Sequence, residues 1–241
     1  MKVAVVTGAS RGIGRAVALQ LAQDGFDIGV NYARGESDAN RVVAEIQNLG
    51  RRAVAVQADV AQVDDVERLF TEIEGKLGAI DVLVNNAGIM KLQKIAEAKS
   101  EMFEETFAVN VRGVFNTLRQ AASRLQKGGR IINFSTTAIA LAPPLYGIYT
   151  ASKAAVESMS YVFAKELRGR QITVNCVAPG PTATDLFMQG KTKEQVDQLA
   201  KAPPLERLGE PEDIARAVSF LAGAQGAWVN AQVIRVNGGL I

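Results

Sequence analysis

Short apolar segments rich in Val, Ile and Ala alternate along the chain with segments whose apolar residues recur every three or four positions. The first pattern predicts buried β-strands, and the second predicts amphipathic helices. The predicted strands cover residues 2–7, 27–32, 52–57, 80–85, 129–135, 171–177 and 232–236. Continuous apolar strands separated by helices are typical of a parallel sheet covered on both faces, so the pattern predicts a doubly wound α/β fold.

The alternation runs on without a repeat, a low-complexity tract or a linker, so we expect a single domain over residues 1–241. Its least regular part, residues 179–211, mixes Pro and Gly with an amphipathic piece around Val196 and Leu199. Loops beyond the carboxyl ends of strands commonly gate ligands, so residues 183–210 could form a substrate lid. A surface excursion without a gating role is the alternative.

The first predicted strand breaks into a glycine-rich loop, TGASRGIG, with Gly8, Gly12 and Gly14. The loop opens onto a predicted helix, whose unpaired N–H groups and positive dipole end favour an anion such as pyrophosphate. It is not a P-loop, because Ile13 rather than Lys follows Gly12. The standard dinucleotide fingerprint has its close glycine pair first, whereas this loop has it last. Taken alone, the loop could also be an ordinary structural turn.

Composition excludes several classes of function. The 241 residues are 48% hydrophobic and carry 27 basic against 25 acidic side chains without a long run of either sign, so we expect no nucleic-acid partner. No apolar segment reaches membrane-spanning length, and no signal-peptide pattern is present, so we expect a soluble cytoplasmic protein. The single cysteine, Cys176, is predicted to be a buried strand thiol. Since there is no histidine, we also expect no metal site.

The segment YTASK places Tyr149 and Lys153 four residues apart. If residues 149–169 form a helix, the two side chains share one face. An ammonium beside a tyrosine hydroxyl favours the phenolate, so we expect Lys153 to lower the pKa of Tyr149 and make it a useful acid or base. Without further context, such a pair is usually only two surface neighbours.

Further motifs follow in a characteristic order: DVLVNNAG at 81–88, FAVNVRG at 107–113, IINFSTTA at 131–138, YTASK at 149–153, CVAPG at 176–180 and the closing VNGG. With the glycine loop, this ordered set resembles the short-chain dehydrogenase/reductase family over essentially the whole chain. The resemblance implies a Rossmann-type fold with seven parallel strands and a nicotinamide cofactor, whose pyrophosphate the glycine loop would cradle.

The same resemblance implies the catalytic roles. Tyr149 would exchange a proton with the substrate oxygen, Lys153 would hold the nicotinamide ribose, and Asn110 would support a water-linked proton path. A helix-interior Asn110 that bonds to nearby backbone is the alternative. The family's serine usually lies thirteen residues before the tyrosine, and that position is Thr136 here. Thr136 is flanked by Ser135 and Thr137, but adjacent strand residues face opposite sides, so we assign the role to Thr136.

The end of the second predicted strand bears on cofactor choice. NAD-specific members typically have an acidic residue there, whereas this strand ends at Tyr32, with Asp27 and Glu36 too far along the chain on either side. Arg11 and Arg34 could bind a 2′-phosphate, so we expect NADP(H). A solvated turn is the alternative for Arg34.

The full cofactor-binding set expected from these arguments and from the resemblance runs along the whole chain. It comprises Gly8, Ser10, Arg11, Gly12, Ile13, Gly14, Asn31, Tyr32, Ala33, Arg34, Asp59, Val60, Asn86, Ala87, Gly88, Tyr149, Lys153, Pro179, Gly180 and Thr182. Asp59 could instead cap a helix, and the turn at 86–88 could merely stabilise the sheet.

Mostly apolar positions are predicted to wall the substrate site: Met90, Leu141, Pro143, Leu145, Tyr146, Leu186, Phe187 and Met188. They suit a carbonyl compound with a hydrophobic tail, although plain packing would use the same residues. The chain is similar to 3-oxoacyl-[acyl-carrier-protein] reductases, which makes an acyl thioester one candidate substrate. Family members that reduce sugars, steroids and small ketones share the same frame.

Two other classes of protein could have the same fold. A non-catalytic dinucleotide-binding regulator would be expected to lack Tyr149 or Lys153, and both are present. A Rossmann-type methyltransferase would leave the spacing of these two residues unexplained. The family resemblance also implies a homotetramer, with helices of residues 110–122 and 149–167 packed against partner copies. Packing of these Ala- and Val-rich faces against the sheet of the same chain is the alternative.

Overall fold

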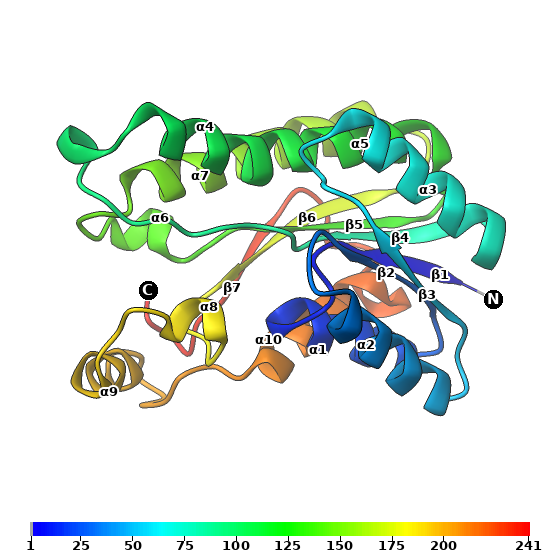
Figure 1. Ribbon diagram of the computed structural model, residues 1–241. Coiled ribbons are helices and arrows are strands. Elements are labelled where there is room, and N and C mark those ends of the chain that lie inside the picture. The colour runs from blue at the N-terminus through cyan, green and yellow to red at the C-terminus, as the bar shows by residue number, and fades with distance from the viewer. Residues whose placement is uncertain (1) are drawn as a thin grey trace.

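Seven strands form one sheet in which every neighbouring pair is parallel (Figure 1). The computed structural model describes residues 2–241. The strands are β1 (Val3–Val6), β2 (Asp27–Tyr32), β3 (Ala53–Gln57), β4 (Ile80–Asn85), β5 (Arg130–Phe134), β6 (Thr173–Pro179) and β7 (Val233–Val236). Each falls on a segment predicted from the apolar pattern, so the predicted parallel seven-stranded sheet is confirmed.

The order across the sheet is β3-β2-β1-β4-β5-β6-β7. The direction of winding reverses between β1 and β4, which are neighbours in space although two strands separate them in the chain. In open parallel sheets, ligands bind in the crevice outside the carboxyl ends of the strands at such a reversal. The topology therefore predicts a ligand site formed by the loops that follow β1, β4 and β5.

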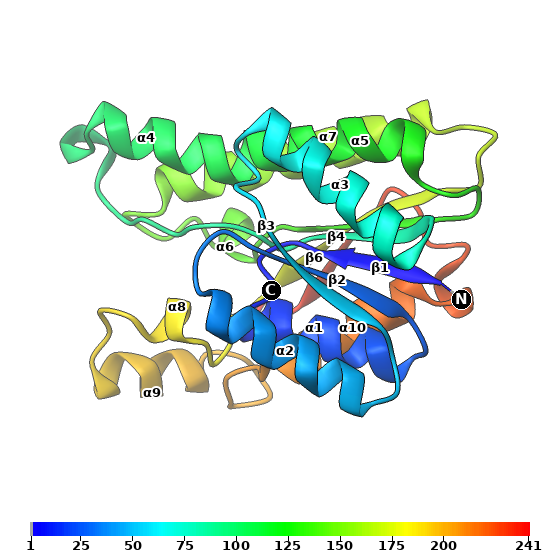
Figure 2. The same cartoon turned by 45° about the vertical axis from the view of Figure 1, so that its right-hand side comes forward.

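Helices cover both faces of the sheet, as Figures 1 and 2 show. One layer contains α1 (Gly12–Gln23), α2 (Glu36–Asn48) and α10 (Pro211–Ala222), and the other contains α3 (Val63–Leu77), α4 (Ser100–Phe107), α5 (Gly113–Arg124) and α7 (Gly147–Glu166). Shorter elements are η1 (Ile95–Glu97), the π-helical turn η2 (Ala108–Arg112), α6 (Ala138–Leu141), α8 (Asp185–Met188), α9 (Lys193–Lys201) and η3 (Ala224–Gly226). Because strands β1, β4, β5 and β6 contribute apolar residues to both sides of the sheet, each helix layer buries its own hydrophobic core against them.

A buried acidic residue begins strand β2. Asp27 is fully buried, and its carboxylate lies 2.8 Å from Arg51 and 2.7 Å from Arg52. Burial alone would raise the pKa of Asp27, but the hydrogen bonds and charges of Arg52 and Arg51 outweigh it and lower that pKa. Asp27 thus anchors the start of β2, at the amino ends of the strands and away from the crevice at their carboxyl ends.

The irregular region from 183 to 210 contains α8 and α9. Backbone hydrogen bonds between its two ends close its base, with Ala183 N donating to Gly209 O at 2.8 Å and Gly209 N donating to Pro181 O at 2.9 Å. In α9, Val196 and Leu199 are partly buried, as the amphipathic pattern predicted. A gating role for this segment stays a prediction. Within residues 2–241, no helix has the length and apolar character needed to cross a membrane.

Candidate active site

A cavity of about 360 Å³ lies at the carboxyl ends of β4, β5 and β6. Residues predicted from the sequence that line it are Ile13, Asn86, Gly88, Thr136, Tyr149, Lys153, Pro179, Gly180 and Thr182. They come from the glycine-loop helix, the loops after three strands and helix α7, so only the tertiary fold brings them together. Lys153 is the only charged side chain in this lining.

The Tyr149–Lys153 pair lies in the first two turns of α7, which begins two residues earlier than predicted. Lys153 is only 4% exposed, and its ammonium donates to the Phe134 carbonyl at 2.9 Å. Burial lowers the pKa of Lys153 to about 8. Burial also raises the pKa of Tyr149 to about 12, although the neighbouring Thr136 hydroxyl favours the phenolate. The expected lowering of the Tyr149 pKa by Lys153 is therefore wrong for this geometry, because desolvation dominates and the ammonium is directed at Phe134.

Three hydroxyl residues follow β5, and all three line the cavity, but only Thr136 is more than a few per cent exposed. Ser135 is buried and donates to a carboxylate oxygen of Glu157. Thr137 is buried and donates to the Ala178 carbonyl at 3.1 Å. Thr136 is partly exposed, lines the cavity and lies by the Tyr149 hydroxyl. The geometry favours Thr136 because its neighbours are otherwise engaged, not because strand alternation continues, since β5 already ends at Phe134.

Asn110 lies in the π-helical turn η2 and is completely buried. Its amide nitrogen donates to Ile89 O at 2.9 Å and to Ser152 Oγ at 3.1 Å, and its oxygen accepts from Ile89 N at 2.9 Å. These bonds are long-range, unlike the local backbone bond that was the alternative. A Cβ added at Gly88 would lie 3.2 Å from Asn110 Oδ1 and 3.4 Å from Lys153 Nζ. Asn110 and Lys153 thus both lie close to Gly88, and the water-linked relay stays a prediction.

The glycine loop has a conformation that side chains would disturb. Gly8 and Gly12 have φ angles of +62° and +54°, which non-glycine residues rarely adopt. A Cβ at Gly14 would lie 2.3 Å from the Gly8 carbonyl and 2.5 Å from the Asn86 amide nitrogen. Helix α1 begins at Gly12, and no side chain caps its first turn. Such a narrow loop with open N–H groups fits the pyrophosphate of a dinucleotide.

A threonine that sequence reasoning missed joins this loop to the turn after β4. Thr7 Oγ1 accepts hydrogen bonds from the backbone N–H groups of Asn86 and Ala87, each at 3.0 Å. In return, the Asn86 amide donates to Thr7 O at 2.9 Å and to Gly8 O at 3.0 Å. The single hydroxyl between a strand and a glycine loop carried no signal by itself, because its partners lie about 80 residues further along the chain.

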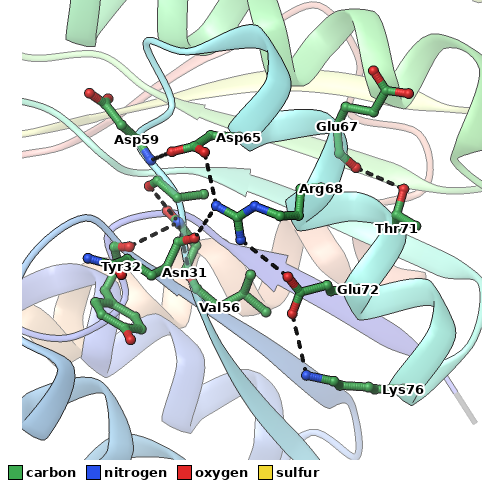
Figure 3. A network of polar contacts seen from close by, with 12 residues as sticks. Asn31, Tyr32, Val56, Asp59, Asp65, Glu67, Arg68, Thr71, Glu72 and Lys76 are labelled. Atoms are coloured by element: carbon green, nitrogen blue, oxygen red, sulfur yellow. Dashed lines mark hydrogen bonds and ion pairs between the residues drawn. The ribbon is translucent and has the colours of Figure 1, made fainter.

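Some predicted cofactor residues have structural side chains. Asn31, which Figure 3 shows beside Tyr32 and Val56, is buried. It accepts from Gly8 N at 3.2 Å and donates to Ala58 O at 3.0 Å, so it joins the glycine loop to the end of β3. The Tyr32 ring belongs to the core. Arg11 and Arg34 are exposed, and within residues 2–241 neither forms an ion pair. Both guanidinium groups are therefore available to an anion.

Asp59 and its neighbours form the polar network of Figure 3. The Asp59 carboxylate accepts from Ala61 N at 2.9 Å, and Asp59 N donates to Asp65 at 2.8 Å. Asp65 in turn pairs with Arg68 at 2.9 Å. The N-cap of α3 is Gln62, so Asp59 stabilises the preceding turn and is not the capping residue. Its side chain stays exposed at the carboxyl edge of β3.

Six of the predicted wall residues line the cavity: Met90, Leu141, Pro143, Tyr146, Leu186 and Phe187. Leu145 and Met188 do not, and both are substantially exposed instead. Lining residues that the sequence did not indicate are Ile89, Phe134, Ser135, Thr137, Ala138, Pro181, Thr184 and Leu199. Leu199 comes from α9, which places part of the predicted lid segment against the cavity.

Comparison with known proteins assigns the family. A family model described as "Enoyl-(Acyl carrier protein) reductase" matches residues 8–241. A short-chain type dehydrogenase/reductase of Picea abies is 47% identical over 250 residues, covering 100% of this chain and 92% of that protein. The chain belongs to the short-chain dehydrogenase/reductase family. Members of this family are oxidoreductases, and the arrangement of Tyr149, Lys153 and Thr136 agrees with that chemistry.

Other similar proteins have more specific names. An NADPH-dependent aldehyde reductase-like protein, chloroplastic, of Arabidopsis thaliana is 46% identical, covering 100% of this chain and 94% of that protein. A 3-oxoacyl-[acyl-carrier-protein] reductase of Staphylococcus epidermidis is 41% identical, covering 99% and 98%. Among solved structures, a blue fluorescent protein from a metagenomic library in complex with NADPH has a TM-score of 0.94 at 38% identity, covering 99% of this chain and 97% of that one.

Proposed function

We propose that the protein is an NADPH-dependent reductase of uncharged carbonyl compounds with an apolar tail, and that it can also run in the direction of alcohol oxidation. The observation that carries this proposal is that Tyr149, Lys153 and Thr136 line one cavity. Ile13, in the first turn of the helix that follows the glycine loop, lines the same cavity. A regulator would need the glycine loop but not these three side chains.

Each side chain has a role that its surroundings support. Bound NADPH supplies the hydride. Tyr149, with a pKa near 12, is protonated at neutral pH and can donate its proton to the carbonyl oxygen. The Thr136 hydroxyl donates a hydrogen bond to the same oxygen, where negative charge develops. Lys153 holds the nicotinamide ribose, and Asn110, which also lies close to Gly88, supports the return of a proton to Lys153.

The preference for NADP(H) rests on charge at the adenosine end. Strand β2 ends at the buried Tyr32, so no strand-end carboxylate repels a 2′-phosphate. Arg11 and Arg34 are exposed near this end and supply donors for that phosphate. Ser10, Ala33 and Val60 complete the proposed contact surface together with the glycines of the loop. The names of the Arabidopsis relative and the NADPH-bound neighbour point the same way.

The substrate class follows from the wall of the cavity. The residues on its substrate side are mostly apolar, with Met90, Leu141, Leu186 and Phe187 among them. A charged substrate such as a sugar phosphate would find no partner there apart from Lys153, which serves the cofactor. Free aldehydes and ketones with an apolar tail are therefore the first candidates. A 3-oxoacyl thioester is the second, because the Staphylococcus epidermidis enzyme is 41% identical.

Consumption of NADPH against a panel of carbonyl compounds tests the proposal. The panel should contain aliphatic and aromatic aldehydes, cyclic ketones, 3-oxoacyl thioesters and sugars, with Tyr149→Phe as the inactive control. We expect turnover of the apolar aldehydes or ketones and little with sugars. NADPH binding without turnover of any compound would favour the regulator and overturn the proposal. Turnover confined to 3-oxoacyl thioesters would select the second candidate.

We also propose the homotetramer, with α5 and α7 at the contact between copies. Val114 and Leu118 of α5 pack into the core of their own chain, whereas Phe115 on the same helix is 48% exposed and Val162 of α7 is 54% exposed. Large exposed apolar side chains on neighbouring helices favour a protein contact. Light scattering should give four copies for the wild type and smaller species for Phe115→Glu. A wild type that stays monomeric at micromolar concentration would contradict this.

The cellular compartment is a separate prediction. The sequence favours the cytoplasm, whereas two similar Arabidopsis thaliana proteins have names that place them in the chloroplast. Fractionation of cells that express the protein would decide.

A further inference from the structure

Four consecutive residues at the end of β5 are each joined to helix α7. From the strand outward, the pairs are Asn133 with Ser160, Phe134 with Lys153, Ser135 with Glu157, and Thr136 with Tyr149. The first is a hydrogen bond of 2.8 Å between side chains, and the second is the bond of 2.9 Å from the Lys153 ammonium to the Phe134 carbonyl. This row of contacts sets how far along the strand, and at what rotation, helix α7 lies.

Two of the four pairs contain the residues proposed for the reaction. The Ser135–Glu157 pair lies between these two pairs. Ser135 lines the cavity, whereas Glu157 does not. Glu157 comes one helical turn after Lys153, so it shares the face of α7 that is directed at β5. Ser135 is 4% exposed and directly precedes Thr136 in the chain. It is also held from the other side, because its backbone N–H donates to Val177 O of β6 at 2.8 Å.

We propose that Ser135 and Glu157 are a positioning pair that fixes the Thr136 hydroxyl relative to Tyr149 and Lys153. This inference rests on the proposed reductase function. A hydrogen bond to a carboxylate is shorter and stronger than one between neutral groups, so it can hold the strand end and the helix in one register. A reacting geometry that loosens by about 1 Å can lose on the order of a hundred-fold in rate. The Ser135 hydroxyl is engaged by Glu157, and Glu157 does not line the cavity.

The Asn133–Ser160 pair supplies a matched control. Ser160 lies further along α7, on the same row of contacts, and its hydroxyl also accepts from the Cys176 thiol at 3.1 Å. Asn133 is bonded in turn to Asn85 of β4 at 2.8 Å. In this pair, Asn133 lies three residues before Thr136, and neither Asn133 nor Ser160 lines the cavity. Ser160→Ala removes a hydroxyl from the same helix, and it should lower stability without a specific loss in kcat.

The experiment compares Ser135→Ala, Glu157→Ala, Glu157→Gln, the double alanine variant and Ser160→Ala. For each, kcat and KM are measured with a carbonyl compound that the wild type reduces, together with the Kd for NADPH and the melting temperature. We expect Ser135→Ala and Glu157→Ala to lose about ten-fold or more in kcat. KM and the Kd for NADPH should change little. Glu157→Gln keeps an acceptor oxygen and should restore most of kcat, and the double variant should be no worse than either single one.

Several results would contradict the proposed positioning role of Ser135 and Glu157. Losses in kcat no larger than that of Ser160→Ala, at a similar melting temperature, would make the contact merely structural. A loss in Ser135→Ala with full activity in Glu157→Ala would give the Ser135 hydroxyl a direct role. Losses that multiply in the double variant would show two independent effects. If the alanine variants do not fold, Glu157→Asp, which keeps the charge but shortens the side chain, must still lose kcat relative to Glu157→Gln.

The proposed function fails in a different way. A wild type that reduces no carbonyl compound overturns the reductase assignment and the positioning role with it. If the wild type is active and all Ser135 and Glu157 variants have the same kcat as the wild type, only the positioning role is overturned.

Discussion

The two sides of the cofactor crevice are built differently. On the β5–α7 side, Thr136, Tyr149 and Lys153 come from a strand end and a helix that are tied by a row of side-chain contacts, and Lys153 is almost completely buried. On the β1–β2 side, the glycine loop presents its backbone rather than side chains to the crevice, and Arg11 and Arg34 are exposed. Chemistry that needs one fixed geometry is therefore in the buried part, and selection of the cofactor is left to exposed charge.

This difference has a consequence for mutation. Removing a buried group that acts at one fixed point should cost much activity and depend little on salt. Removing one of two exposed arginines should cost less, and the loss should shrink as ionic strength rises, because exposed charges are screened.

Tyr149→Phe should have the largest effect. It removes only the hydroxyl, so the fold and the Kd for NADPH should be preserved while the proton donor is lost. General acid catalysis contributes about 10²–10⁴-fold, and we expect a loss of kcat in that range. Steady-state kinetics and NADPH fluorescence measure the two parts. Turnover within a few-fold of wild type would mean that another group donates the proton.

Thr136→Val should come next. The replacement nearly preserves shape but removes one donor to the developing oxyanion, which can cost on the order of a hundred-fold in kcat. Thr136→Ser should retain activity, because it keeps the hydroxyl. A purely structural hydroxyl would instead lower stability by about 1 kcal/mol with little change in rate. Turnover and melting temperature of both variants distinguish these outcomes, and a fully active Thr136→Val enzyme would contradict the assignment.

The exposed side of the crevice should respond more weakly. Arg34→Ala and Arg11→Ala should each reduce the preference for NADPH over NADH by roughly ten-fold at low salt, since a charge-assisted contact is worth about 1.5–3 kcal/mol before screening. Use of NADH should change little. The ratio of kcat/KM for the two cofactors, measured at two ionic strengths, gives the answer. A wild type that uses NADH better than NADPH would remove the basis of this prediction.

The smallest effect concerns pH. Lys153 must be protonated to hold the ribose, and burial lowers its pKa to about 8. Its charge is present below that value and is lost as pH rises through it, so kcat/KM for NADPH should fall to about half its plateau near pH 8. Tyr149 stays protonated across this range, since its pKa is about 12. A profile that is flat to pH 10 would show that Lys153 keeps its proton when the cofactor arrives.

Much of the fold could be predicted because the signals are local. The Val- and Ile-rich segments predicted all seven strands within two residues at each end. The four-residue spacing of Tyr149 and Lys153 predicted a shared helix face, and α7 has it. Glycines at 8 and 12 indicated unusual backbone, and both have positive φ angles. In each case, residues close in the chain determine the outcome.

Other features were decided only by contacts between distant segments. Local alternation could not show that Ser135 bonds to Glu157, that Asn31 bridges the glycine loop and β3, or that Leu199 of α9 reaches the cavity. The pKa of Tyr149 is the clearest example: the sequence placed a lysine beside it, but the fold buries Lys153, desolvates the Tyr149 hydroxyl and directs the ammonium at Phe134. Hydrophobic periodicity is set by neighbours in the chain, whereas desolvation and hydrogen-bond partners depend on what the sheet and helices bring together.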